Sequence, residues 1–178
     1  MSYSGGRILL NSQREGQVSR FRAWVLFLVP LLAILFQVYV PLFFQFLGFL
    51  EMPLLVVVYF ALMRRNPIHG LLIGAVVGLA QDSLSQKTPL GMFGIVNTLV
   101  GYFAASVGVR FDVENVVVRF LLAFFFYGFH QVFYWVMAHA LLAQQVGLEL
   151  QKTLLIGLLN AVVGVSLYHF LDKLRQTA

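Results

Sequence analysis

The sequence predicts an all-α membrane protein, a polytopic six-helix bundle, and three observations lead to that prediction. Of the 178 residues, 60% are hydrophobic and 11% are charged, whereas a soluble domain carries roughly 25% charged residues. Apolar runs with few internal charges recur from Ala23 to Leu171. The longest polar stretch is the first 22 residues, so we expect no separate soluble domain. Long apolar runs separated by short polar turns are the pattern of transmembrane helices.

The apolar runs define six membrane segments in one bundle, residues 23–172, between an N-terminal arm (1–22) and a short tail (173–178). Trp24 begins the first segment, at the depth where an interfacial aromatic residue belongs. The fifth segment is rich in aromatic residues, which we interpret as lipid-facing bulk rather than a ligand cage. The expected segments are approximately 23–44, 53–63, 67–84, 89–109, 116–143 and 153–171.

The second segment is unusually short. It follows Glu51, and Pro53 suits the first turn of a helix. As a helix it spans about 16 Å, less than the ~30 Å of the hydrocarbon core. We therefore expect either a helix that begins within the membrane or buried irregular structure at 43–50 that leads into it. Residues 41–53 should be the least regular part of the fold.

Two turns share one device, a capping residue followed by proline. We expect Asn66-Pro67 to start the third segment and Thr88-Pro89 to start the fourth. Asn and Thr side chains accept from the free N–H groups of a first helical turn, and proline is tolerated there.

Positive charge is distributed unevenly along the chain. An even number of crossings places both termini on one side, and only Lys87 and Lys152 of the 12 Lys and Arg residues then fall on the other. The positive-inside rule assigns the side of the termini to the cytoplasm. The net charge of +5 therefore reflects topology and not nucleic-acid binding. We interpret residues 1–22 as a solvated cytoplasmic arm, with a short interfacial helix as the alternative.

One helix face of the third segment carries small residues and an acid. Gly70, Gly74, Gly78 and Asp82 are each four residues apart, which places them along one ridge of a helix. Glycines allow another backbone to approach closely. A carboxylate is costly near lipid, and the macrodipole disfavours it in a last helical turn. For Asp82 three roles stay open: a structural hydrogen bond that closes the 82–91 turn, a cavity or partner surface, or chemistry.

Two segments repeat a spacing of glycine and asparagine. Gly94, Asn97 and Gly101 in the fourth segment correspond to Gly157, Asn160 and Gly164 in the sixth. Coincidence among small residues is one interpretation. The other is that both are closely packed inner helices whose asparagines hydrogen-bond between helices.

No motif for catalysis, metal binding or a cofactor is found. The chain has no cysteine and four histidines, and it lacks the helical His-Glu-x-x-His pattern, a phosphate-binding glycine loop and a nucleophile elbow. His130 lies mid-segment beside Gln131, and we expect a hydrogen bond within the bundle, with a proton relay or ligand contact as the alternative. We therefore predict a protein that is not an enzyme and holds no cofactor.

Residues 53–104 contain a characteristic series of motifs: the acid that follows the glycine ridge, the Leu-Gly pair eight and nine residues after it, and the flanking segments. These are Pro53-Leu-Leu-Val-Val-Val-Tyr59, Arg64-Arg65-Asn66-Pro67, Gly74…Gly78-Leu-Ala-Gln-Asp82-Ser-Leu-Ser85, Pro89-Leu90-Gly91 and Leu99-Val100-Gly101-Tyr102. Over these residues the chain resembles the rod shape-determining protein MreD family. Gln86 stands where that family often has glycine.

The resemblance implies a non-catalytic component of the bacterial elongation machinery for peptidoglycan, in the inner membrane. It implies direct binding to MreC and membership of one complex with MreB, RodA and the elongation penicillin-binding transpeptidase. It also implies a fold like that of vitamin-transporter substrate-binding subunits. The residues we expect at a partner surface or cavity are Gly70, Gly74, Gly78, Asp82, Ser85, Pro89, Gly91, Asn97 and Tyr102.

Two other functions remain open from the sequence. One is a small-molecule-binding subunit of a transporter, whose outward-facing pocket would use Gln37, Gln45, Asp82, Asn97 and His130. The other is a lipid-binding protein whose outer groove accepts an acyl or polyprenyl chain, and this function is compatible with a scaffold.

Overall fold

The computed structural model describes residues 20–85, 89, 91–142, 147 and 149–176. Within them the fold is that of an all-α protein, as predicted, with six α-helices. The helices are α2 (Ala23–Phe43), α3 (Met52–Arg64), α4 (Pro67–Leu84), α5 (Met92–Gly108), α6 (Val116–Leu142) and α7 (Leu150–Asp172). The 3₁₀ helix η1 (Gln45–Phe49) and two short strands, β1 (Arg20–Phe21) and β2 (Arg175–Gln176), complete the described elements. Most of the N-terminal arm, together with Gln86 and Thr88, lies outside this range.

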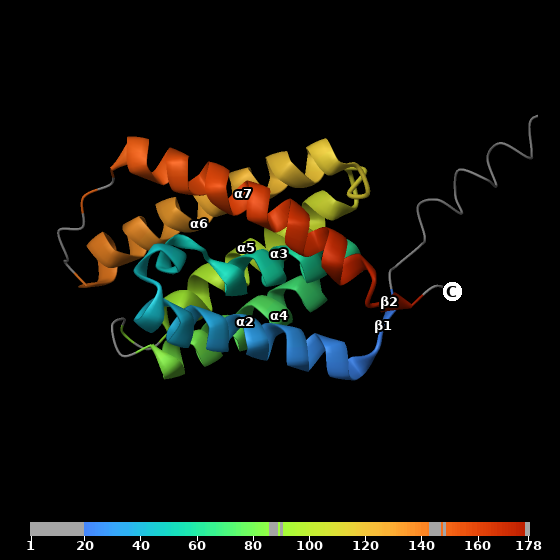
Figure 1. Cartoon of the computed structure of the whole chain (residues 1–178), viewed down its shortest axis with the longest axis horizontal. Helices are drawn as coiled ribbons and strands as arrows, with labels where there is room; N and C mark the ends of the chain where they lie inside the picture. Colours follow the sequence, from blue (N-terminus) through green and yellow to red (C-terminus); the bar gives the residue numbers. More distant parts are fainter. Residues whose placement is uncertain (1–19, 86–88, 90, 143–146, 148, 177–178) are drawn as a thin grey trace, which may run out of the picture.

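Helix α3 is the centre of the bundle, with α6 and α7 along one side of it and α2 and α4 along the other (Figure 1). Every residue from Leu54 to Met63 is buried. A run that is apolar on all sides suits a helix that is surrounded by other helices. At 13 residues, α3 spans only about 20 Å, so its short length is compatible with enclosure by longer neighbours.

Four helices are long and apolar enough to cross a membrane: α2, α4, α6 and α7. Helices α3 and α5 are apolar but shorter. The expected segment ranges and the helices agree within one residue except at two starts: α5 begins at Met92 and not at Pro89, and α7 begins at Leu150 and not at Thr153. The chain between α2 and α3 is the irregular stretch that the sequence predicts, but η1 within it contains no buried residue.

The two ends of the bundle differ. Strands β1 and β2 pair antiparallel, with Phe21 opposite Arg175, and bring the two ends of the described chain together at what we call the termini end (Figure 1). The opposite end carries Asp82 and the connection between α4 and α5, and we call it the turn end. Because successive helices alternate in direction, the α3–α4 and α5–α6 connections lie at the termini end.

Candidate functional site

Asp82 is buried at the turn end, with 2% of its surface exposed. Its Oδ2 accepts hydrogen bonds from the backbone N–H groups of Gly91 at 3.0 Å and Gly94 at 2.9 Å. Its Oδ1 accepts from the N–H of Phe93 at 3.1 Å. The carboxylate therefore caps α5. The sequence left three roles open for Asp82. The structure contains the hydrogen bonds that the structural role requires, between Asp82 and the start of α5.

The capping geometry explains why an acid stands at the end of α4. The dipole of α4 disfavours a negative charge in its last turn, but the first turn of α5 lies beside it and favours one. Free N–H groups of a first helical turn need acceptors when they are buried. Thr88-Pro89 was expected to supply this cap. That expectation is wrong for Pro89, because the helix starts three residues later, where Asp82 satisfies its first N–H groups.

Ser85 and Gly91 lie on the two sides of the connection between α4 and α5. Ser85 is the C-cap of α4, and its N–H donates to the carbonyl of Gln81 at 2.9 Å. Gly91 precedes α5 with φ of 97°, a left-handed conformation that glycine adopts without steric cost. Pro89 is exposed. These residues present a small surface at the turn end.

The glycine ridge of α4 packs directly on α5. A Cβ atom built on Gly70 would lie 2.2 Å from the carbonyl oxygen of Gly101, and one on Gly74 would lie 2.0 Å from that of Asn97. Gly78 would meet the carbonyl oxygen of Phe93 at 2.3 Å. No side chain fits at these positions. The close approach that the ridge predicts is thus made within the chain, and α5 covers the ridge.

The two buried asparagines connect separate elements, as the repeated spacing suggests. Asn97 Nδ2 donates to Gln81 Oε1 at 3.3 Å, from α5 to α4. Asn160 Oδ1 accepts from the N–H of Glu51 at 2.8 Å, and its Nδ2 donates to the carbonyl of Phe49 at 2.9 Å. Asn160 thereby fixes the chain between η1 and α3. The partner of Asn160 is a connecting segment and not another helix.

Other polar candidates have mainly structural roles. Gln37 Oε1 accepts from the N–H of Met52 at 3.2 Å, at the start of α3. His130 is buried, and its ring stacks near Phe93 and Tyr134, with centroid distances of 5.9 and 6.5 Å. A hydrogen bond within the bundle was expected for His130, but its Nδ1 has no partner among the described residues. Stacking of the ring, and not a polar contact, holds this side chain.

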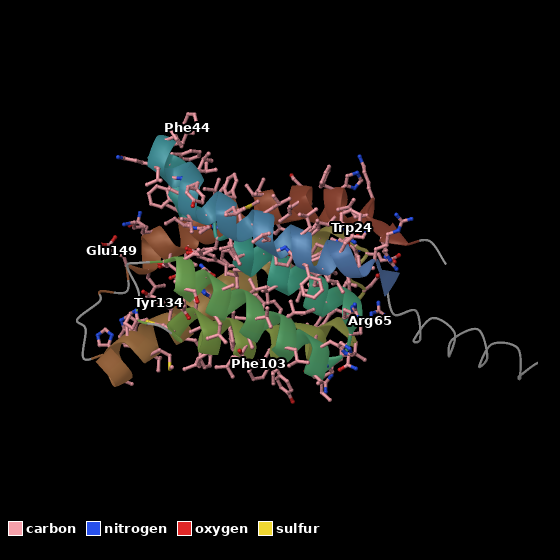
Figure 2. All side chains as sticks on the ribbon, turned by 90° about the horizontal axis from the view of Figure 1, so that it is seen from below. Trp24, Phe44, Arg65, Phe103, Tyr134 and Glu149 are labelled. Atoms are coloured by element: carbon pink, nitrogen blue, oxygen red, sulfur yellow. The ribbon has the colours of Figure 1, made fainter. Side chains whose placement is uncertain are left out.

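Exposed apolar side chains lie on the outer sides of α4 and α5. Tyr102 is 43% exposed and its ring meets that of Phe103 edge to face, with centroids 5.4 Å apart. On α4 the side chains of Leu72 and Val76 are more than half exposed. Figure 2 shows the outward position of Phe103 on the same pair of helices. We call these exposed apolar residues, Leu72, Val76, Leu79, Ile95, Tyr102 and Phe103, the α4–α5 face.

A buried ionic network at the termini end was not anticipated from the sequence. Arg119 is 5% exposed; its Nη1 donates to Asp172 Oδ2 at 2.5 Å and its Nε donates to the carbonyl of Val113 at 2.6 Å. The Tyr59 hydroxyl donates to Asp172 Oδ1 at 2.9 Å. This network joins α3, α6 and α7. The only sequence signal was an acid at the end of the last apolar segment.

The position of Glu51 was also not explained by the sequence. It lies between η1 and α3, outside the membrane-spanning helices, and burial raises its pKa to about 7. Its carboxylate has no hydrogen-bond partner within the described part of the chain. Glu51 is therefore a polar group inside the turn end that the fold does not satisfy.

These observations define a class of protein: a helical membrane bundle whose buried polar side chains hold backbone and helices in place. Among the described residues no three His, Asp or Glu side chains gather as metal ligands would. The model of the family "rod shape-determining protein MreD" matches residues 19–178, nearly the whole chain. The chain belongs to the MreD family, whose members are shape-determining membrane proteins and not a known family of enzymes. No curated protein and no solved structure matches, so the likeness to vitamin-transporter subunits stays a prediction.

Proposed function

We propose that this chain is a non-catalytic component of the rod complex for peptidoglycan synthesis and that it binds MreC directly. The observation that supports this proposal most is the MreD family match over residues 19–178. Binding of MreB, RodA and the transpeptidase would be indirect, through the same complex. We further propose that the protein lies in the inner membrane with both termini in the cytoplasm, on the distribution of Lys and Arg.

The covered ridge changes where the partner's helix is expected to bind. Gly70, Gly74 and Gly78 contact α5, so a partner cannot reach them while α4 and α5 are packed together. Their contribution is to hold α4 and α5 in close backbone contact, so that the exposed side chains of both helices keep fixed positions. We propose that the transmembrane helix of MreC binds the α4–α5 face, and that the turn-end residues Ser85, Pro89 and Gly91 contact its part outside the membrane. In lipid, such binding depends on packing and shape, because both partners are already in an apolar solvent.

The test is co-purification of MreC with the tagged chain from its native membrane. Two matched substitutions place a bulky ring on different exposed faces: Val76→Trp on α4 (62% exposed) and Val132→Trp on α6 (48% exposed). Neither side chain contributes to the core, so both variants should fold. We expect Val76→Trp to reduce MreC recovery several-fold and Val132→Trp to leave it unchanged.

Two results would contradict the proposal at different levels. Equal recovery of MreC with both variants and the wild type rejects the α4–α5 face as the binding surface. Absence of MreC from the wild-type sample, with an ATPase-coupled membrane subunit in its place, rejects the scaffold function itself.

One observation favours the alternative of a ligand-binding subunit. Glu51 is unpaired, and Asn97 Oδ1 and His130 Nδ1 are buried without a partner in the described residues, which is a common property of sites that accept a ligand. Against it, Asp82 and Gln37 already bind backbone groups. Thermal stabilisation of the purified protein by one member of a vitamin panel would support this alternative, and the absence of any shift would reject it for those compounds.

A further inference from the structure

The arginines whose side chains are described at the termini end fall into two groups. Arg119 and Arg175 form ion pairs with Asp172 and Glu114. Four others, which we call the arginine rim, form no ion pair with any described residue. They are Arg22, Arg64, Arg65 and Arg110.

Packing of the helices brings the arginine rim together around the last turn of α3. Gly108, at the end of α5, lies against Leu62, where a built Cβ would be 2.6 Å from the carbonyl oxygen. Arg110 follows two residues later. Phe21 packs edge to face on Phe60, with centroids 5.2 Å apart, and Arg22 is the next residue. Arg64 and Arg65 end α3 itself, and Figure 2 shows Arg65 at this end of the bundle together with Trp24.

One atom of the arginine rim lacks an acceptor. Arg64 Nε is buried and has no hydrogen-bond partner in the described part of the chain. A buried donor without an acceptor costs about 1–3 kcal/mol, more when it is charged. Arg65 beside it is only partly exposed. The position therefore favours an anion that approaches from outside the chain and supplies the missing acceptor.

The surroundings of the arginine rim are apolar and exposed. Trp24, Ile68, Val109 and Phe111 adjoin its four members in sequence, and each is at least half exposed. Asp112, two residues after Arg110, accepts a hydrogen bond from the N–H of Glu114 at 3.2 Å and forms no ion pair with any of the four. Positive charge bordered by exposed apolar side chains at the end of a transmembrane bundle matches a phospholipid, with its phosphate at the arginines and its acyl chains along the helices.

We propose that the arginine rim binds the phosphate headgroup of an anionic phospholipid. The arginines supply the charge, and Arg64 Nε supplies a donor for a phosphate oxygen. The bound lipid covers the last turn of α3 between the starts of α2 and α4 and the end of α5. An acidic protein segment would pair with the arginines but would not cover the exposed apolar side chains around them, whereas the acyl chains of a lipid would, so the structure favours the lipid.

The test is a lipid titration of the full chain in non-ionic detergent, followed by native mass spectrometry. Phosphatidylglycerol and phosphatidylcholine with identical acyl chains are compared. The double variant Arg65→Gln/Arg110→Gln is compared with Lys152→Gln/Lys173→Gln, which removes the same charge at exposed lysines outside the arginine rim. We expect the wild type to prefer phosphatidylglycerol. Each arginine contributes about 1 kcal/mol to binding of an anionic lipid. The first variant should therefore bind phosphatidylglycerol roughly 30-fold more weakly, and the affinity of the second variant should equal that of the wild type.

Arg64→Lys separates position from charge. It keeps the positive charge and removes the Nε donor, so we expect a several-fold loss of affinity for phosphatidylglycerol. Equal binding of both lipids by the wild type, or equal losses in the two double variants, would overturn the proposal. Displacement of phosphatidylglycerol by millimolar inorganic phosphate would show a site for free phosphate, and displacement by poly-glutamate a site for an acidic protein; either result rejects the lipid.

Discussion

Removal of the Asp82 carboxylate should separate the start of α5 from the end of α4. The carboxylate accepts three backbone hydrogen bonds, from Gly91, Phe93 and Gly94, at 2.9–3.1 Å. Asp82→Ala leaves all three donors without a protein acceptor. Asp82→Asn keeps the shape and one acceptor oxygen, but its amide NH₂ would face at least one N–H group.

The expected loss of stability follows from the number of N–H donors that each substitution leaves without an acceptor. An unsatisfied buried donor costs about 1–3 kcal/mol, and water at the half-buried Gly91 can recover part of this. We therefore expect Asp82→Ala to lower the free energy of unfolding by roughly 3–6 kcal/mol. Asp82→Asn leaves one N–H donor without an acceptor and removes the charge assistance of the other hydrogen bonds, so its cost should be about 1–3 kcal/mol.

Thermal unfolding of the detergent-purified variants, followed by tryptophan fluorescence, measures this order. Asp112→Ala is the matched control, because Asp112 also accepts a backbone N–H group but is exposed; its cost should be below about 1 kcal/mol. Equal melting temperatures for Asp82→Ala, Asp112→Ala and the wild type would refute the capping role. A loss in Asp82→Asn as large as in Asp82→Ala would show that charge, and not the number of acceptors, is what matters.

Three further changes test other parts of the fold. Gly74→Ala forces a Cβ to about 2.0 Å from the carbonyl oxygen of Asn97 and should lower the melting temperature strongly, whereas Gly128→Ala meets open space and should stabilise α6 by up to about 1 kcal/mol; equal effects would refute the packing of α4 on α5. Burial raises the pKa of Glu51 from 4.5 to about 7, so its protonated form stabilises the fold, and this contribution is full below pH 4.5 and lost as the pH rises through 7. Glu51→Gln should remove this pH dependence of the melting temperature and raise the free energy of unfolding at pH 8 by up to about 3 kcal/mol. The same pH dependence of the melting temperature in the variant and the wild type would contradict the burial of Glu51. Arg65 has a left-handed backbone conformation, with φ of 52°, which glycine adopts without strain, so Arg65→Gly should raise the free energy of unfolding by about 1 kcal/mol. A lower melting temperature of this variant would show that the arginine side chain stabilises the turn more than its backbone conformation destabilises it.

The fold could be predicted from the sequence because hydropathy alone defines membrane helices. The short α3 was predicted as well, since Glu51 and Arg64 limit its length. The cap of α4 was also predicted: Asn66 Oδ1 accepts from the N–H groups of Ile68 and His69 at 3.0 and 3.4 Å. These are local features, decided by residues within a few positions of one another.

Features that depend on distant partners could not be predicted. A glycine ridge shows that some backbone comes close, but nothing in the periodicity of α4 identifies α5 as that backbone. Arg119 and Asp172 are 53 residues apart, and Asn160 lies 109 residues from Glu51. Asp82 is intermediate: its unfavourable place in α4 indicated a tertiary role, but the beginning of α5 at Met92 becomes clear only when the two helix ends are seen together.

The use of polar groups inside the bundle bears on what the protein can do. At the turn end, Asp82 and Asn160 bind backbone groups, and at the termini end Asp172 binds Arg119 and Tyr59. Each such contact satisfies a group that lipid would leave without a partner, so these residues stabilise the bundle. The exposed surface of the same helices carries many large apolar side chains. A rigid interior combined with an apolar exterior suits a protein that acts by holding another membrane protein in position, which is the function that we propose for this member of the MreD family.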